Sequence, residues 1–220
     1  MNTNQQNHEP QQEETLELIG PAKPIAMALI KTAEVLRKNV KSPDWKPLKK
    51  KSLNMVFHGS SGTGKTTIVN AFANALLGED IDYTLVGNAV VADTIKDWTQ
   101  QAAYCVTAPS GIVVKIINEV DKVYANAQCS MLQFLDEAPN DWVILGTTNA
   151  APDLTQPFWS RWRAVKVAKP TNEEVSTLLI KKFALDRRIA DRIALESEGN
   201  VRTAINKAEV YILTGNLDSN

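Results

Sequence analysis

The sequence has few cysteines and histidines, the residues on which small disulfide-rich or metal-stabilised proteins depend. Its 220 residues contain two cysteines, Cys105 and Cys129, and two histidines, His8 and His58. The cysteines form no C-x-x-C pair, and the histidines do not have the spacing of metal ligands. We therefore expect reduced thiols, both buried as small apolar side chains, in a core that needs no disulfide or structural metal.

Long apolar runs and an excess of one charge are also missing. No stretch approaches the apolar length of a membrane span, and the first residues lack the hydrophobic segment of a signal peptide. Lys and Arg number 24 against 25 Asp and Glu, a net charge of −1, so any contact with DNA must be local. These absences predict a cytoplasmic protein without membrane contact.

Composition divides the chain into three parts. Residues 1–15 have hardly an apolar side chain and are predicted to be a disordered tail. Residues 16–169 are predicted to form an α/β nucleotide-binding domain, and residues 170–220 a small helical domain. Thr171 and Glu174 have the spacing of a capping box, and Asn200 is the expected cap of the last helix. That helix is predicted to bury Ala204, Ile205, Ala208, Tyr211 and Ile212.

One stretch has a pattern with a direct chemical meaning, G-x-x-x-x-G-K-[ST]. It consists of Gly59, Ser60, Ser61, Gly62, Thr63, Gly64, Lys65 and Thr66. Glycines let the loop turn its backbone N–H groups toward phosphate, the lysine adds a positive charge, and the threonine hydroxyl ligates magnesium. A predicted buried strand at residues 53–58 precedes the loop, and an amphipathic helix follows it, with Thr67 in its first turn. The pattern predicts a nucleoside triphosphate site.

Two more apolar strands are predicted to end in polar side chains. Residues 112–117 lead into Asn118 and Glu119, and residues 142–146 lead into Thr147, Thr148 and Asn149. In an open α/β sheet, ligands bind at the carboxyl ends of the strands, so these side chains are predicted to face the phosphates. A carboxylate there can orient and deprotonate an attacking water, and we assign that role to Glu119.

With these motifs in place, residues 16–213 resemble the AAA+ ATPases, and most closely the clamp-loader small subunits related to replication factor C. By this resemblance, residues 59–66 are the Walker A loop and residues 112–121 the Walker B strand, with Glu119 the catalytic glutamate. Asn149 matches the first sensor, and Arg202, in Gly-Asn-Val-Arg, matches the second. Arg161, in Ser-Arg, resembles an arginine finger presented to a neighbouring subunit. Ile19 and Gly20 lie where the family lines its adenine pocket.

The resemblance implies a fold and a chemistry. The fold is a P-loop NTPase parallel sheet of order 5-1-4-3-2, sandwiched by helices, with a small C-terminal helical lid. The cofactors are ATP and Mg²⁺, the metal being bound by Thr66 and, indirectly, by Asn118 and Glu119. The reaction is ATP hydrolysis, in which Lys65, Glu119, Asn149, Arg161 and Arg202 act at sites shared between the subunits of an oligomer.

Two features differ from the family pattern. Asn118 stands where the family carries an aspartate, which predicts weak hydrolysis because a negative charge near the metal is lost. The chain also stops soon after the lid, without the helical collar of clamp-loader subunits. The sequence leaves three functions open: an ATPase that remodels or loads a DNA-associated protein partner, a nucleotide-gated assembly scaffold with little hydrolysis, and a transposition or helicase-loading regulator that coats DNA.

Overall fold

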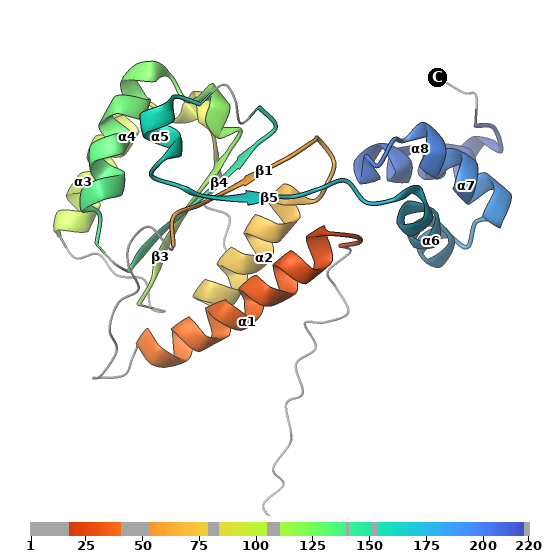
Figure 1. The fold of residues 1–220 in the computed structure, drawn as a ribbon, viewed down its shortest axis with the longest axis horizontal. Coiled ribbons are helices and arrows are strands. Elements are labelled where there is room, and N and C mark those ends of the chain that lie inside the picture. The colour runs from red at the N-terminus through yellow and green to blue at the C-terminus, as the bar shows by residue number, and fades with distance from the viewer. Residues whose placement is uncertain are drawn as a thin grey trace, which may run out of the picture.

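A parallel β-sheet covered by helices on both faces carries a separate group of three helices at one end (Figure 1). The computed structural model describes residues 18–40, 53–78, 84–104, 111–139, 141–150 and 154–217. The predicted tail at residues 1–15 lies outside these ranges, as does Cys105.

The sheet has the predicted topology. Its strands are β1 Met55–His58, β2 Thr84–Val86, β3 Val113–Asn118, β4 Trp142–Thr148 and β5 Arg163–Lys166. All neighbouring pairs are parallel, and the order is β2-β3-β4-β1-β5, which is 5-1-4-3-2 read from the other edge. The predicted fold class is confirmed. Because the strands are parallel, their carboxyl ends meet at one edge of the sheet.

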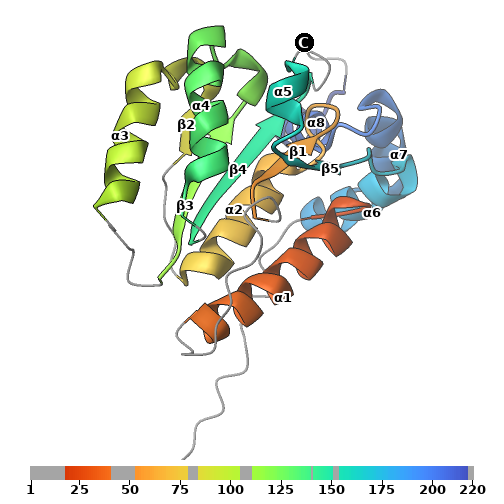
Figure 2. The same cartoon turned by 60° about the vertical axis from the view of Figure 1, so that its left-hand side comes forward.

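Helices cover the two faces of this sheet unequally. α1 Ala22–Val40 and α2 Lys65–Leu77 pack on one face, while α3 Ala92–Ala103, α4 Ala125–Glu137 and the short α5 Gln156–Trp159 cover the other (Figure 2). Two 3₁₀ turns, η2 Gly87–Ala89 and η3 Val120–Lys122, pack against each other beside the ends of β2 and β3.

Local sequence accounts for these elements. Every residue of β4 is buried because both faces of this central strand are covered by helices. Its sequence therefore begins with a continuous apolar run instead of an alternation of apolar and polar residues. α2 is bounded by two glycines, since Gly64 precedes it and Gly78 follows it in the left-handed conformation that ends helices. The P-loop is thereby held between β1 and α2.

Three helices form the lid: α6 Asn172–Phe183, α7 Arg187–Glu196 and α8 Val201–Thr214. The predicted capping box is present, since the Thr171 hydroxyl accepts from the N–H of Glu174 and the Glu174 carboxylate accepts from the N–H of Thr171. Asn200 caps α8 through its side-chain oxygen, which accepts from the N–H of Thr203. The helices enclose a cluster of their own, built around Val175, Leu179, Ala190, Ile193, Ala194, Ala204 and Ala208.

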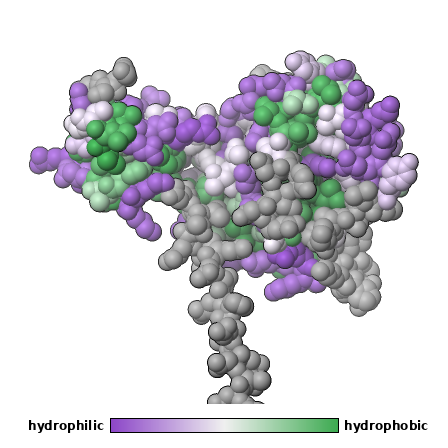
Figure 3. Space-filling view, turned by 180° about the vertical axis from the view of Figure 1, so that it is seen from behind, coloured by the Kyte–Doolittle hydropathy of each residue, from purple (hydrophilic) through white to green (hydrophobic). Residues whose placement is uncertain are grey.

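Two predicted burials are wrong. Ile212 is 53% exposed because the last turn of α8 extends past the small core of the lid. Together with Leu195, Val210 and Leu213 it contributes apolar surface to the smaller lobe of the molecule (Figure 3). Cys129 is exposed as well, because its position on α4 faces away from the sheet. No helix in the described ranges is long and apolar enough to cross a membrane.

Candidate nucleotide-binding site

The P-loop adopts a backbone that requires glycine at two central positions. Gly62 and Gly64 have φ angles of +70° and +91°, in the left-handed region that disfavours side chains. A β-carbon at Gly62 would also collide with the side chain of Asn200, and one at Gly64 would lie 2.7 Å from a methyl carbon of Leu18. The loop therefore touches both the lid and the segment before α1.

The ammonium group of Lys65 is held against the loop. Its Nζ donates to the carbonyl oxygens of Gly59, at 3.0 Å, and Ser60, at 2.6 Å. The pKa of Lys65 is lowered, first by burial and then by the positive charge of Arg202, while Asp121 acts in the opposite direction. Burial, Lys166 and Lys65 likewise lower the pKa of His58 at the end of β1. These shifts mark a positively charged site that an anion would stabilise.

The ends of β3 and β4 face this lysine across a cavity of about 330 Å³. Its lining includes Ser61, Gly62, Gly64, Lys65, Thr66, Thr67, Asn118, Glu119, Thr147, Thr148, Asn149 and Arg202. Most of the residues predicted to contact the phosphates, metal and attacking water are therefore brought together here, and we call this space the phosphate cavity. Gly59 and Ser60 are not among its lining residues; they lie behind it and present their carbonyls to Lys65.

Threonines of β4 hold the polar end of β3 in place. The hydroxyl of Thr147 donates to Oδ1 of Asn118 at 2.9 Å and accepts from the N–H of Glu119 at 3.3 Å. The hydroxyl of Thr148 donates to Oδ1 of Asp121 at 2.5 Å and accepts from the N–H of Ala150 at 3.0 Å. The amide oxygen of Asn118 is thus engaged by Thr147.

Glu119 occupies a strained position next to this network. Its φ of +57° lies in the left-handed region, which is uncommon for a residue with a side chain. Its Oε2 lies 2.7 Å from Nζ of Lys122, and both side chains are substantially exposed. This hydrogen bond raises the pKa of Lys122. The carboxylate therefore lines the phosphate cavity while paired with a lysine three residues on.

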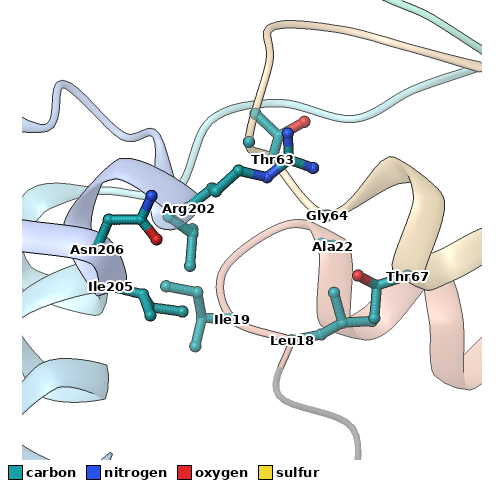
Figure 4. A pocket seen from close by; sticks show the side chains of 11 residues that line it. Leu18, Ile19, Ala22, Thr63, Gly64, Thr67, Arg202, Ile205 and Asn206 are labelled. Carbon is teal, nitrogen blue, oxygen red and sulfur yellow. The ribbon is translucent and has the colours of Figure 1, made fainter. Parts of the chain in front are cut away.

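A second cavity, of about 430 Å³, opens from the first. Gly62, Gly64, Thr67 and Arg202 line both, and the second is otherwise lined by Leu18, Ile19, Ala22, Thr63, Val201, Ile205 and Asn206. Ile19 and Ile205 approach it from opposite sides (Figure 4). We call this space the base cavity, because its apolar walls suit a planar ring.

Gly20, predicted with Ile19 to line the adenine pocket, is not among the lining residues of the base cavity. A β-carbon at Gly20 would lie 2.9 Å from both Oε2 of Glu174 and the β-carbon of Pro170. Gly20 instead lets the chain pass close to the start of the lid. Ile19 packs on the apolar cluster inside the lid, while Leu18 packs on the apolar core between the sheet, α1 and α2. The two neighbouring residues therefore connect the lid to the α/β domain.

The lid is attached to the P-loop through the start of α8. The N–H of Val201 donates to the carbonyl of Gly62 at 3.0 Å, and Asn200 packs on the same glycine. Arg202 follows at once and extends toward the loop (Figure 4), which is why it lines both cavities. The structure thus places the predicted second-sensor arginine at the phosphate end of the site.

Arg161 lies elsewhere. It follows α5, and its guanidinium binds Asp136 of α4 at 2.6 Å and 2.7 Å and donates to the carbonyl of Pro157 at 2.9 Å. It lines neither the phosphate cavity nor the base cavity. The site of this chain is therefore built without the predicted finger.

The oxygen donors of the phosphate cavity fit a magnesium ion that is carried by a nucleotide. In the described part of the chain, no group of three or more His, Cys, Asp and Glu side chains could hold a metal by itself. Thr66 and Glu119 line the cavity, while the carbonyl of Asn118 accepts a hydrogen bond from Thr147. Such a sparse set suits Mg²⁺, which keeps waters and phosphate oxygens as most of its ligands.

Sequence reasoning missed several lining residues, namely Leu18, Ala22, Val201, Ile205 and Asn206. Helical spacing could have found two of them, because residues 202, 205 and 206 share a face of α8 at i, i+3 and i+4. The two threonines of β4 were predicted at the site, but their partners, at the end of β3 and in η3, could not be paired without the strand register.

A P-loop between a strand and a helix, with polar strand ends facing it, defines a nucleotide-binding ATPase of the P-loop class. The model of the ATPase family associated with various cellular activities (AAA) matches residues 55–170, more than half of the chain. This protein belongs to that family, and the predicted enzyme class and family are confirmed.

The chain is also similar to individual proteins. The replication factor C small subunit of Haloarcula marismortui is 26% identical over 177 residues, which cover 74% of this chain and 53% of that protein. Replication factor C subunit 4 of Saccharomyces cerevisiae is 27% identical over 169 residues, covering 71% and 52%. The chain thus spans about half the length of these relatives. The predicted similarity to clamp-loader small subunits is confirmed.

Solved structures support the fold. The RuvB Holliday junction branch migration motor of Thermotoga maritima superposes with a TM-score of 0.63 at 18% identity, covering 87% of this chain and 61% of that one. At this identity the match shows a shared architecture.

Lys65→Ala should weaken nucleotide binding at least about tenfold, since a hydrogen bond to a charged group contributes about 1.5–3 kcal/mol. Titration of a fluorescent ATP analogue, with circular dichroism to verify folding, measures the effect. Lys166→Ala is the matched control, because Lys166 is exposed on β5 and lines neither cavity. Equal affinities of Lys65→Ala and the unmodified chain would exclude the phosphate cavity as the binding site.

Proposed function

We propose that this protein binds ATP with Mg²⁺ and hydrolyses it. The observation that carries the proposal is the single cavity that joins the P-loop residues Lys65 and Thr66 to Glu119 and Asn149 from the strand ends and Arg202 from the lid. A triphosphate there would lie between Lys65 and Arg202. Burial, and after it the positive charge of Arg202, lower the pKa of Lys65. The phosphates would supply the counter-charge that these cations lack.

Each side chain has a role that follows from its place. The backbone N–H groups of the loop and Lys65 bind the outer phosphates, and the Thr66 hydroxyl is a ligand for Mg²⁺, which neutralises phosphate charge when bound. The carboxylate of Glu119 accepts a proton from the attacking water, and Asn149 orients that water by hydrogen bonding. Arg202 stabilises negative charge on the transferred group.

The proposal includes a site shared between subunits. Arg161 lines neither cavity of its own chain, and its ion pair with Asp136 lies on the outer face of α4 and α5. Arg161 can therefore act as an arginine finger, in addition to Arg202, only at the site of a neighbouring copy. The Arg161–Asp136 pair is partly exposed, so exchange of the carboxylate for a phosphate of the neighbour costs little.

Remodelling or loading of a DNA-associated protein is the biological role we propose. It rests on the similarity to replication factor C small subunits, about half of whose length this chain spans. ATP binding and hydrolysis in the phosphate cavity would drive this remodelling by changing the position of the lid, because α8 is hydrogen-bonded directly to the P-loop.

A second function, a nucleotide-gated scaffold with little hydrolysis, is favoured by two contacts at the catalytic end. Asn118 directs its carbonyl to Thr147, and Glu119 is paired with Lys122. Asn118 brings no negative charge to the metal site and its carbonyl is already hydrogen-bonded, while the carboxylate of Glu119 is held by Lys122 and away from a water. Phosphate release at saturating ATP separates the two functions.

Glu119→Gln should bind ATP with unchanged affinity and hydrolyse it about 10²–10⁴-fold more slowly, because the amide cannot accept the proton of the water. Phosphate release measures the rate. Lys122→Met is the control, since it breaks the same ion pair and leaves the carboxylate in place. A wild-type rate in Glu119→Gln would assign the activation of water to another group.

Arg161→Ala should bind ATP normally and lose about 10³–10⁵-fold in turnover, the contribution of a finger supplied from a neighbour. Turnover should reappear when Arg161→Ala and Glu119→Gln chains are mixed, because some interfaces then combine an intact Glu119 with an intact Arg161. Arg163→Ala, at an exposed position on β5, should behave like the unmodified chain. Co-assembled mixtures that stay inactive would argue against a shared site.

Asn118→Asp should lower the Mg²⁺ concentration needed for half-maximal hydrolysis about fivefold or more, the effect of about 1 kcal/mol of Coulomb attraction. One carboxylate oxygen would still accept from Thr147, leaving the other to face the cavity. Magnesium titrations of both proteins at saturating ATP test this. Coincident curves would mean that residue 118 does not influence the metal.

A further inference from the structure

The base cavity has two polar side chains that it does not share with the phosphate cavity, Thr63 and Asn206. The hydroxyl of Thr63 is buried and donates to the carbonyl of Ser60 at 3.0 Å, so it belongs to the internal bonding of the P-loop. Asn206 is different: among the described residues its side-chain amide has no hydrogen-bond partner. Its amide is therefore a polar group of the base cavity, outside the phosphate cavity, that is available to a ligand.

Asn206 lies on α8 one helical turn beyond Arg202. It lies four residues after Arg202, so the two side chains share a helix face with their β-carbons about 5–6 Å apart. Arg202 extends to the P-loop, and Asn206 projects beside Ile205, one turn farther along (Figure 4). A nucleotide whose phosphates lie in the P-loop would bring its base, beyond the ribose, to that turn.

The remaining walls explain why a polar contact there would discriminate. Leu18, Ile19, Ala22 and Ile205 offer contacts that any flat ring can make, so they bind a base without identifying it. A side-chain amide carries both a carbonyl acceptor and an NH₂ donor. Adenine presents an exocyclic amine next to a ring nitrogen acceptor, the pair that a single amide can satisfy at once.

We propose that Asn206 recognises the base, its carbonyl accepting from the exocyclic amine of adenine and its NH₂ group donating to the adjoining ring nitrogen. The inference rests on the proposed binding of ATP and assigns a specificity-determining residue to that site. Asn206 is exposed at the rim of the cavity, so water competes for the same bonds. The expected contribution is therefore that of an ordinary neutral hydrogen bond, about 2- to 10-fold in affinity.

The test compares ATP with purine riboside triphosphate, which lacks the exocyclic amine and is otherwise the same ligand. Competition of each against a fluorescent nucleotide on the full chain gives the ratio of the two affinities. Asn206→Leu keeps the approximate size of the side chain and removes both hydrogen-bonding groups. Asn172→Leu makes the same change at an exposed position of the lid, at the start of α6 and outside both cavities.

We expect the unmodified chain and Asn172→Leu to prefer ATP by about 2- to 10-fold. Asn206→Leu should bind both ligands equally, because it loses more affinity for ATP than for the purine analogue, which keeps the ring nitrogen but lacks the amine. An Asn206→Leu chain that keeps the preference, or that weakens for both ligands alike, overturns the assignment while leaving ATP binding intact. Binding of neither ligand by the unmodified chain would overturn the proposed function itself.

Discussion

Gly62 is subject to two constraints at once. Its backbone has the positive φ that the phosphate loop requires, and its α-carbon faces Asn200 at a separation that leaves no room for a β-carbon. Its carbonyl also accepts a hydrogen bond from Val201. Gly62 therefore both shapes the loop and contacts the lid. Any rearrangement of the loop around phosphate would displace the first turn of α8.

Two positive charges also meet where the P-loop contacts α8, those of Lys65 and Arg202. Burial and Arg202 lower the pKa of Lys65, which means that the two cations are held together at a free-energy cost. Glu119 is the acidic residue among those that line the phosphate cavity, and it pairs with Lys122 instead of with Lys65 or Arg202. The Lys65 ammonium is instead satisfied by two loop carbonyls. An anionic ligand would bring both the charge and the oxygen atoms that this arrangement calls for.

The side of the site formed by the strand ends is organised by β4. Thr147 bonds the side chain of Asn118 at the end of β3, and Thr148 bonds that of Asp121 in η3. The positions of both side chains therefore depend on the register of β3 and β4. The left-handed backbone of Glu119 packs under η2, where a β-carbon on Gly87 would collide with the carbonyl of Glu119. The surrounding structure thus maintains the strained backbone of Glu119, and such strained residues are common at functional sites.

The sequence by itself determined the sheet order by resemblance, the loop and its flanking strand and helix, the capping box at Thr171 and the cap at Asn200. Apart from the sheet order, which the family resemblance implied, these features are set by residues close together in the chain, through periodicity, glycine conformations and local hydrogen bonds. The polar strand ends could be predicted to meet because parallel strands end at one edge.

Tertiary structure decided the rest. The pairing of Arg161 with Asp136, the exposure of Cys129 and Ile212, the place of Gly20 beneath the lid and the opening of Asn206 into the base cavity all depend on how separate elements pack. A helical pattern specifies which side chains share a face, but which part of that face is covered depends on the length and position of neighbouring elements. Contacts between residues far apart in the chain have no local signature, and the two cavities of this protein are made of such contacts.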